Sequence, residues 1–289
     1  MALIKAINDK RRGQRQAVRR EQGGHVRVED VSIVFETPGQ RHVAVESTTL
    51  DIEPGEFVCL LGPSGCGKST LMNAVAGFVR PATGVVTVDG EPVTRPSPKR
   101  GMVFQQHSLF PWKTVLRNVM FGPLMAGEAP IGAESTARTF LDMVGLTAFA
   151  DRFPMTLSGG RQQRVGIARA LANYPSVLLM DEPFGALDAQ TRSMMQENLL
   201  KLWEDFKITV LFVTHDIDEA VFLGDRVVVM SAAPGRIIAD FKVDIERPRT
   251  SDALLSPEFM RIKKQCMDLI RQESMLAFEQ QSRRLAAGE

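Results

Sequence analysis

The chain has 289 residues, of which 44% are hydrophobic and 24% charged, and these values are ordinary for a globular protein that can bury a substantial core. Its 35 basic and 34 acidic side chains give a net charge of +1, so charge provides no argument for nucleic-acid binding as the main activity. The three cysteines, Cys59, Cys66 and Cys266, are too scattered for a disulfide framework or a zinc site and predict a reduced, cytoplasmic environment.

Residues 1–22 form a basic arm in which only Asp9 and Glu21 oppose the Lys and Arg side chains. We expect a solvated, partly helical tail, with contact to anionic lipid head groups or a partner as the alternative. The arm has no long apolar run, so it does not resemble a secretory signal. The longest apolar runs of the chain, at 177–180 and 208–213, are far shorter than the roughly 20 residues of a membrane helix. Any membrane part must therefore come from another subunit.

Residues 23–240 are predicted to form one α/β domain, because short apolar strands alternate with helical patterns. Expected strands lie at 26–35, 43–52, 57–61, 84–88, 101–104, 177–180 and 208–213. Expected helices lie at 69–78, 114–126, 134–144, 160–173 and 189–206. The first two strands alternate apolar and polar residues, which predicts an N-terminal antiparallel portion. The later strands are continuously apolar, which predicts a mostly parallel sheet covered by helices on both faces.

Two mostly helical segments accompany this domain. Residues 106–173 are predicted to form an α-helical insertion, and residues 241–289 a C-terminal helical extension. Apolar side chains of the extension recur at helical spacing at Phe259, Ile262, Cys266, Leu269 and Ile270. This pattern predicts one buried face that docks onto the main domain.

A glycine-rich loop follows the strand expected at 57–61 and precedes a helix. It consists of Gly62, Pro63, Ser64, Gly65, Cys66, Gly67, Lys68, Ser69 and Thr70. The spacing matches a phosphate-binding loop, whose backbone N–H groups and helix dipole bind phosphate oxygens. We expect Lys68 to reach the β- and γ-phosphates of ATP, and the Ser69 hydroxyl to contact Mg²⁺.

Polar residues with a catalytic pattern end the next two apolar strands. Asp181 and Glu182 follow the strand at 177–180, at the edge of the sheet where the phosphate loop also opens. Asp181 is predicted to hold Mg²⁺, and Glu182 to orient and deprotonate the attacking water. His215 follows the strand at 208–213 and is predicted to contact the γ-phosphate. The other histidines, including His25, have no such context.

A second anion site is predicted at Ser158, Gly159 and Gly160, where a helix begins with exposed N–H groups. The chain already has a complete phosphate loop. The second site is therefore most simply explained if it completes the nucleotide site of another copy.

Together these motifs resemble the nucleotide-binding subunit of ABC transporters over about residues 26–236. The resemblance rests on 62–70, Gln105, 157–164, 177–182, 185–188 and His215. It implies a P-loop ABC ATPase core that binds ATP and Mg²⁺ as a head-to-tail dimer with two sandwiched ATP molecules. It also implies that Phe35 stacks on adenine, with a core strand position as the alternative for this residue. Phe at 35, Arg161 and Gly185 replace the family's commoner Tyr, Gln and Ser.

The resemblance also assigns residues at the dimer seam. Ser158, Gly160 and Gln162 of one copy would contact the nucleotide held by Lys68 of the other, and Asp188 would line the seam. Gln105 would contact Mg²⁺ and the γ-phosphate and connect them to the helical insertion, which contacts a transmembrane permease dimer.

Further segments resemble the nitrate, sulfonate and taurine importer branch of that family. They are 101–105, 109–112, 118–122, 181–192, 215–222, 234–236, 247–249 and 256–259. The branch implies a peripheral subunit at the cytoplasmic face of the inner membrane, served by an extracytoplasmic solute-binding protein. It implies uptake of taurine or another alkanesulfonate first, and of nitrate, bicarbonate or a pyrimidine precursor after that. Alternatives are a non-transport ABC ATPase of translation or DNA repair, an exporter or lipid-transport ATPase, and a regulatory binding module.

Overall fold

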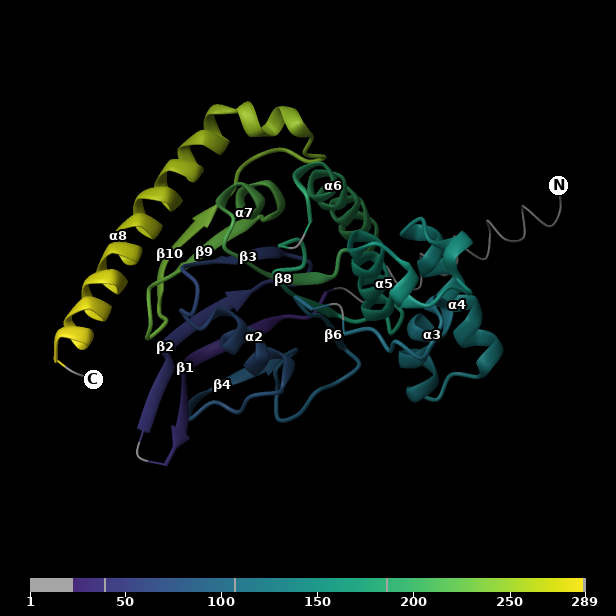
Figure 1. The fold of residues 1–289 in the computed structure, drawn as a ribbon, viewed down its shortest axis with the longest axis horizontal. Coiled ribbons are helices and arrows are strands. Elements are labelled where there is room, and N and C mark those ends of the chain that lie inside the picture. Colours follow the sequence, from purple (N-terminus) through teal and green to yellow (C-terminus); the bar gives the residue numbers. More distant parts are fainter. Residues whose placement is uncertain (1–22, 39, 107, 186, 288–289) are drawn as a thin grey trace.

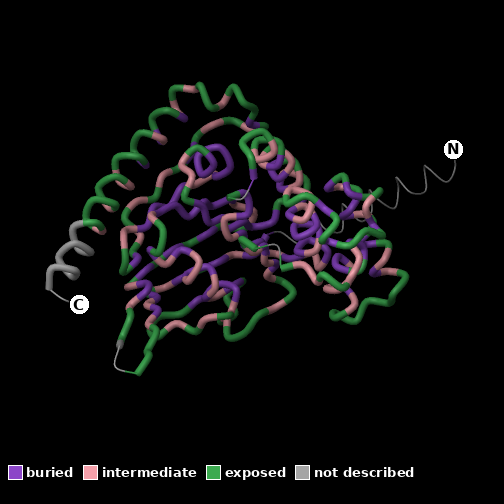
Figure 2. Tube along the Cα trace, in the orientation of Figure 1, coloured by how far each residue is buried: buried purple, intermediate pink, exposed green. Residues whose placement is uncertain are grey.

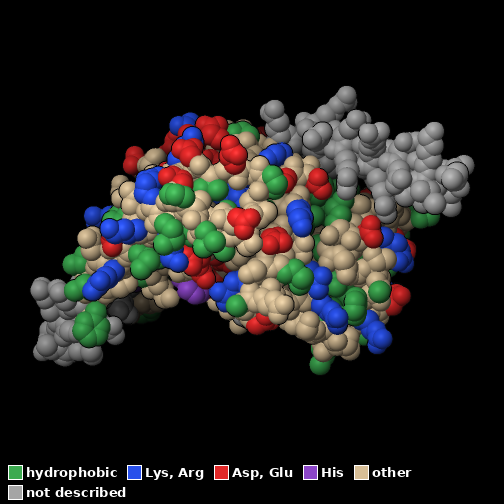
Figure 3. Space-filling view, turned by 90° about the horizontal axis from the view of Figure 1, so that it is seen from above, with side chains coloured by type: hydrophobic (Ala, Val, Ile, Leu, Met, Phe, Trp, Pro, Cys, Tyr) green, Lys and Arg blue, Asp and Glu red, His purple; other side chains and the backbone are tan. Residues whose placement is uncertain are grey.

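The computed structural model describes residues 23–287 apart from residues 39, 107 and 186, with side chains described as far as Phe278. The basic arm predicted at residues 1–22 lies outside the described residues. No helix in the described part combines the length and the apolar composition of a membrane span. Seen from above, the surface shows acidic and basic side chains interspersed (Figure 3).

Two sheets organise the described residues (Figure 1). An antiparallel sheet has the order β2-β1-β4-β5, made from β1 (Val26–Thr37), β2 (Gln40–Ile52), β4 (Thr83–Val88) and β5 (Glu91–Pro92). A second sheet has the order β10-β9-β3-β8-β7-β6. Its strands are β3 (Phe57–Leu61), β6 (Arg100–Val103), β7 (Val177–Asp181), β8 (Thr209–Thr214), β9 (Arg226–Met230) and β10 (Ile237–Lys242). All its pairings are parallel except β9 with β10.

The second sheet is covered on both faces, as its continuously apolar strands predict. Phe57, Cys59 and Leu61 of β3 belong to one core cluster, and Val58 and Leu60 to another. Helix α2 (Lys68–Ala76) and the antiparallel sheet pack in the second cluster. Helices α5 (Gly159–Leu171), α6 (Ala189–Phe206) and α7 (Ile217–Leu223) pack in the first. The buried trace therefore runs through the middle of the molecule (Figure 2).

The predicted helical insertion contains α3 (Val115–Met125), α4 (Pro130–Met143) and α5, and α3 and α4 lie at the end of the molecule opposite α8 (Figure 1). Helix α4 begins four residues before the predicted start at 134, because Pro130 occupies its first turn, where proline is favoured. Strands β9 and β10 were not predicted. Strand β10 is half exposed and pairs at the sheet edge.

The C-terminal extension docks on the main domain, as its apolar spacing predicts. After the short helix η3 (Ser251–Leu255), helix α8 (Pro257–Ala287) buries Phe259, Ile262 and Cys266 against the core, while its later Met275 and Phe278 are exposed. Leu269 and Ile270 are partly buried against the same core.

A buried arginine connects this extension to α7 through hydrogen bonds. Arg249 is only 5% exposed, and its guanidinium donates to five backbone carbonyls, those of Val221, Phe222, Gly224, Val243 and Ile245. Burial lowers the pKa of Arg249 to about 10, so the group stays charged at neutral pH. The charge therefore faces the carboxyl end of α7, where a cation is favoured by the helix dipole.

Replacing this guanidinium should destabilise the fold strongly. Arg249→Met keeps the apolar stem but leaves buried carbonyls without a donor, and we expect a loss of about 3 kcal/mol in the free energy of unfolding. Chemical denaturation measures it, with the exposed Arg261→Met as the matched control. Equal losses in the two variants would contradict this role of Arg249.

Candidate nucleotide-binding site

The glycine-rich loop connects β3 to α2. Gly67 adopts a left-handed backbone with φ of +97°, and a Cβ there would lie 2.6 Å from the carbonyl oxygen of Ala44. Only glycine fits this combination of backbone conformation and close approach. Ser64 and Gly65 are exposed at the loop tip, so the loop presents its backbone to solvent there.

Lys68 begins α2 and turns back over the loop. Its Nζ donates to the carbonyl oxygens of Gly62, at 2.9 Å, and Pro63, at 2.8 Å, and the residue is only 4% exposed. It also contacts Cys66 Sγ at 3.9 Å. A buried ammonium group bound by neutral groups can form a stronger, charge-assisted hydrogen bond to a phosphate. The site therefore fits an anionic ligand.

Ser69 and Asp181, the two predicted magnesium ligands from α2 and β7, are in direct contact. The Ser69 hydroxyl donates to Asp181 Oδ1 at 2.8 Å. Burial raises the pKa of Asp181 and the bond from Ser69 opposes that shift. A hydroxyl and a carboxylate oxygen at one point form a hard-oxygen donor set, which fits Mg²⁺ beside the phosphate loop.

Three residues predicted to act near the γ-phosphate also meet. Glu182 Oε2 lies 3.1 Å from Nδ1 of His215 and 3.4 Å from Nε2 of Gln105, which donates to it. These residues follow β7, β8 and β6, neighbouring parallel strands whose carboxyl ends share one edge of the sheet. Gln105 thus contacts Glu182 rather than the Ser69–Asp181 pair.

The backbone of Glu182 is unusual. Its φ is +41°, in the left-handed region that non-glycine residues rarely occupy, and its N–H donates to the carbonyl oxygen of Val213 at 2.9 Å. Strain of this kind concentrates at functional sites. His215 is 56% exposed at its side chain and Glu182 only 19%, so the carboxylate is shielded beneath an accessible imidazole.

The predicted second anion site opens α5. Ser158 has an extended backbone at the N-cap and makes no side-chain capping bond, and both it and Gly159 are exposed. Gln162 of the same turn donates to the carbonyl oxygen of Leu157 at 3.1 Å. Among the described residues, no hydrogen bond or ion pair joins Ser158 or Gly160 to the glycine-rich loop, so this anion site is not part of the same chain's phosphate loop.

Asp188 lies close to this second site. A Cβ on Gly160 would come within 3.1 Å of Thr191 Cγ2, which places the start of α5 against the start of α6. Asp188 is exposed and caps α6, and its Oδ1 accepts from the N–H of Thr191 at 2.9 Å. That hydrogen bond lowers the pKa of Asp188.

Phe35, the predicted adenine contact, lies on β1 opposite His42 and is 43% exposed. A position buried in the core would not leave this ring accessible, so it is available for stacking.

Arg192 was missed by the sequence reasoning, although it ends the 181–192 motif. Its Nη1 donates to Asp216 Oδ2 at 3.1 Å and its Nη2 to the carbonyl oxygen of Leu187 at 3.1 Å. Asp216 directly follows His215 and caps α7, so Arg192 connects α6 to the segment that carries the histidine.

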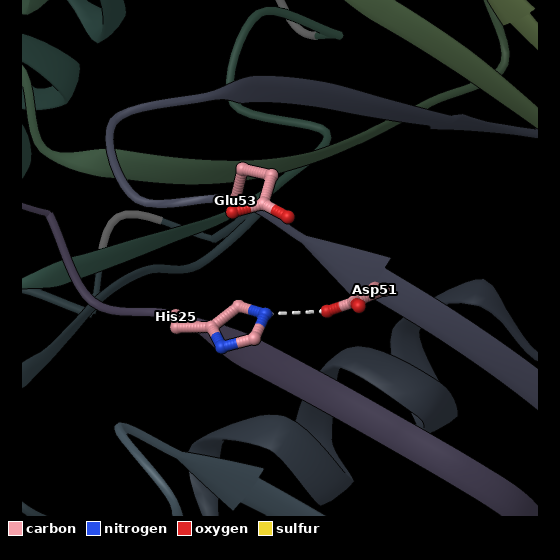
Figure 4. A group of neighbouring side chains, drawn as sticks. All are labelled: His25, Asp51 and Glu53. Atoms are coloured by element: carbon pink, nitrogen blue, oxygen red, sulfur yellow. Dashed lines mark hydrogen bonds and ion pairs between the residues drawn. The ribbon is translucent and has the colours of Figure 1, made fainter.

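A separate group of side chains lies on the antiparallel sheet (Figure 4). His25 Nε2 contacts Asp51 Oδ1 at 2.6 Å, and Glu53 lies close enough that the potential ligand atoms are all within 4.8 Å of one another. Both carboxylates are exposed, and Arg27 Nε lies 3.9 Å from Asp51. Asp51 therefore has two basic neighbours, His25 and Arg27, on the surface outside the nucleotide site.

Comparisons with known proteins agree on one family. Residues 45–185 match the family model described as ABC transporter. The nitrate import ATP-binding protein NrtD of Synechocystis sp. is 45% identical over 253 residues, covering 86% of this chain and 95% of that protein. The taurine import ATP-binding protein TauB of Roseobacter denitrificans is 48% identical over 217 residues, covering 75% of this chain and 81% of that protein.

Solved structures give the same fold. The dimeric structure of MJ0796, a bacterial ABC transporter cassette, is 34% identical with a TM-score of 0.69, covering 76% of this chain and 100% of that one. The same cassette is similar at the same level in a post-hydrolysis state bound to ADP and Pi. At these identities and coverages, the chain belongs to the ABC transporter family as an ATP-binding subunit, of the kind that hydrolyses ATP.

Proposed function

We propose that this chain energises an ABC importer by hydrolysing ATP at the cytoplasmic face of the inner membrane. The proposed cargo is taurine or another alkanesulfonate, followed by nitrate, bicarbonate or a pyrimidine precursor. The contact of Glu182 with His215 and Gln105, one residue after Asp181, carries the proposal for hydrolysis. The relatives named for nitrate and taurine import support the importer direction and the cargo class.

In the proposed mechanism the β- and γ-phosphates of ATP bind the backbone N–H groups of the loop. Lys68 then exchanges the carbonyls of Gly62 and Pro63 for phosphate oxygens. Ser69 and Asp181 would hold Mg²⁺, which supplies positive charge beside the phosphates. Phe35 stacks on the adenine ring.

The hydrolytic step uses the carboxylate of Glu182 as a general base. It orients the attacking water in line with the γ-phosphate and accepts a proton at Oε2. His215 donates a hydrogen bond to the γ-phosphate, and Gln105 transmits the state of the phosphate to the helical insertion. The shielded position of Glu182 favours this role, because a carboxylate with few water contacts is pre-oriented.

A second copy completes each site in this proposal. The partner's Ser158 and Gly160 bind the γ-phosphate held by Lys68, and Asp188 lines the seam. The accessible N-terminus of α5 and its separation from the same chain's loop support this arrangement. The dimeric ABC cassette structures similar to this chain support it as well.

The helical insertion carries the proposed contact with the permease. Asn118 is fully buried; its amide donates to the carbonyl oxygens of Phe110, Lys113 and Thr114, and its carbonyl accepts from the N–H of Phe110. This clamp holds a loop on which Trp112 is 70% exposed. Further large apolar side chains of the insertion are exposed at Met125, Ile131, Phe153 and Met155. Exposed apolar surface of this kind marks a protein contact.

A charge on this surface should weaken permease binding without affecting the catalytic site. Trp112→Glu and Met155→Glu should each reduce co-purification with the permease from solubilised membranes by about tenfold, because a buried unpaired carboxylate costs at least 1.4 kcal/mol. Basal ATP hydrolysis by the purified subunit should be unchanged. Met275→Glu on α8 is the control, since Met275 is also exposed, at 58%, and lies outside the insertion. Unimpaired recovery with both variants would contradict the proposed surface.

The cargo is tested by reconstitution. The subunit is purified with its membrane partner, and ATP hydrolysis is measured with solute-binding proteins loaded with taurine, nitrate or bicarbonate. Stimulation by one loaded protein identifies the cargo. Failure to recover any membrane protein with the subunit would overturn the transporter role and favour a non-transport ATPase.

A further inference from the structure

A cavity of about 290 Å³ lies where the C-terminal extension meets the ATPase core. It is lined by residues of α6, α7 and η3, and by Asp216, which directly precedes α7. Helices α6 and α7 are in contact, and η3 packs on α7. Arg249 holds the chain just before η3 against the end of α7, so the position of this wall is fixed by buried hydrogen bonds. We name it the α6–α7 cavity.

The charge of the α6–α7 cavity is unbalanced. Four carboxylates line it, those of Glu197, Asp216, Asp218 and Glu219, against one guanidinium. Arg192 pairs with Asp216, and Lys263 of α8 pairs with Asp218 at 2.7 Å. Within the described residues, Glu197 and Glu219 have no ion pair with a Lys or Arg.

Glu219 is the unusual member of this set. It is only 5% exposed, and its Oε1 accepts from Gln196 Nε2 at 3.0 Å, a neutral donor. Burial raises the pKa of Glu219, and hydrogen bonds from the neutral side chains of Thr214 and Gln196 oppose that shift. A carboxylate held this way next to an open volume gains most from a cation that enters that volume.

We propose that the α6–α7 cavity binds a small organic cation, an alkylammonium or guanidinium compound, and that this ligand slows ATP hydrolysis. The ammonium group lies between Glu197 and Glu219. Phe222 and Leu254 supply apolar wall for the methylene groups. The volume is at the lower end of ligand pockets, which fits a molecule of few heavy atoms.

The cavity is connected to the hydrolytic residues. A much smaller pocket of about 20 Å³ beside Glu182 and His215 shares three lining residues with it, Arg192, Asp216 and Glu219. Asp216 Oδ1 accepts from the N–H of Glu219 and its Oδ2 accepts from Arg192, so both carboxylate oxygens are hydrogen-bonded between the cavity and the smaller pocket. A bound cation bridges α6 and α7 through these carboxylates, contacts η3 at Leu254, and so restrains the segment that carries His215. This inhibitory effect rests on the proposed function, whereas the binding does not.

Calorimetric titration of the full-length, nucleotide-free protein with putrescine tests the binding. We expect saturable binding of putrescine and none of 1,4-butanediol, which has a similar shape without charge. Leu254→Trp fills the cavity and should weaken binding at least about tenfold. Leu255→Trp is the matched control, because Leu255 is 83% exposed and does not line the cavity. Absence of saturable binding, or equal affinity in these two variants, would overturn the site.

A surface substitution tests the charge independently of packing. Glu197→Gln should weaken putrescine binding about threefold, while Asp205→Asn, exposed on the same helix outside the cavity, should leave it unchanged. Equal effects of the two substitutions would show non-specific attraction and contradict the site.

The effect on catalysis is measured separately. Saturating putrescine should lower the maximal rate of ATP hydrolysis at least about twofold in the parent protein and not in Leu254→Trp. Putrescine that binds without changing the rate would overturn the effector role. A parent protein that binds putrescine but hydrolyses no ATP would overturn the proposed function and leave the binding site supported.

Discussion

Glu182→Gln is expected to reduce ATP turnover by about 10²- to 10⁴-fold while ATP binding is retained. Glutamine keeps the shape of the side chain and the contact with Gln105, but its amide cannot accept the proton of the attacking water. ATP should then persist between two copies, so the variant should form a stable dimer in the presence of ATP. Phosphate release measures turnover, and gel filtration with and without ATP measures the dimer.

The exposed Glu246→Gln is the control for this substitution, because it makes the same chemical change away from the site. It should hydrolyse ATP at the parent rate. Parent-rate hydrolysis by Glu182→Gln as well would show that another group activates the water.

Lys68→Met is expected to weaken ATP binding by roughly 10- to 100-fold, because it removes a charge-assisted hydrogen bond to the phosphates. Methionine fills most of the same buried space, so the variant should remain folded. In the nucleotide-free protein it loses the bonds to the carbonyls of Gly62 and Pro63 and the long contact with Cys66 Sγ. Equilibrium dialysis with labelled ATP measures the affinity, and thermal unfolding monitors the fold. Lys99→Met on the exposed surface controls for loss of charge, and equal affinity in both variants would contradict the role of Lys68.

The strands beside the nucleotide loop could be predicted because they are short, continuously apolar and bounded by turns. Strands β3, β7 and β8 are buried along nearly their whole length, which sequence periodicity detects. Strand β10 alternates intermediate and exposed residues at a sheet edge, and its partner is set by the tertiary fold. Local sequence therefore gave no comparable signal for it.

In the candidate site too, some residues could be predicted from local sequence and others depend on the tertiary fold. Lys68, Asp181 and Glu182 lie in motifs with fixed spacing, and their positions follow from a strand that ends beside a loop. Arg192 and Arg249 act across long separations: Arg249 donates to carbonyls 25 to 28 residues away at the carboxyl end of α7. No local sequence pattern predicts such contacts, because they depend on how α6, α7 and the C-terminal extension pack together.

The central claim is that two copies of the chain share each ATP site, and complementation tests it most directly. Lys68→Met lacks a working phosphate loop, and Ser158→Arg lacks a working second anion site. Ser158 is exposed, so the fold should tolerate the larger side chain. Each variant alone should hydrolyse almost no ATP. In a mixed dimer, the intact loop of one copy faces the intact Ser158 segment of the other, so one of its two sites is complete.

An equimolar mixture of the two variants is therefore assayed for phosphate release. Random association makes half of the dimers mixed, each with one complete site, so activity should rise to about a quarter of the parent value. A mixture that stays as inactive as its two components would contradict a shared site.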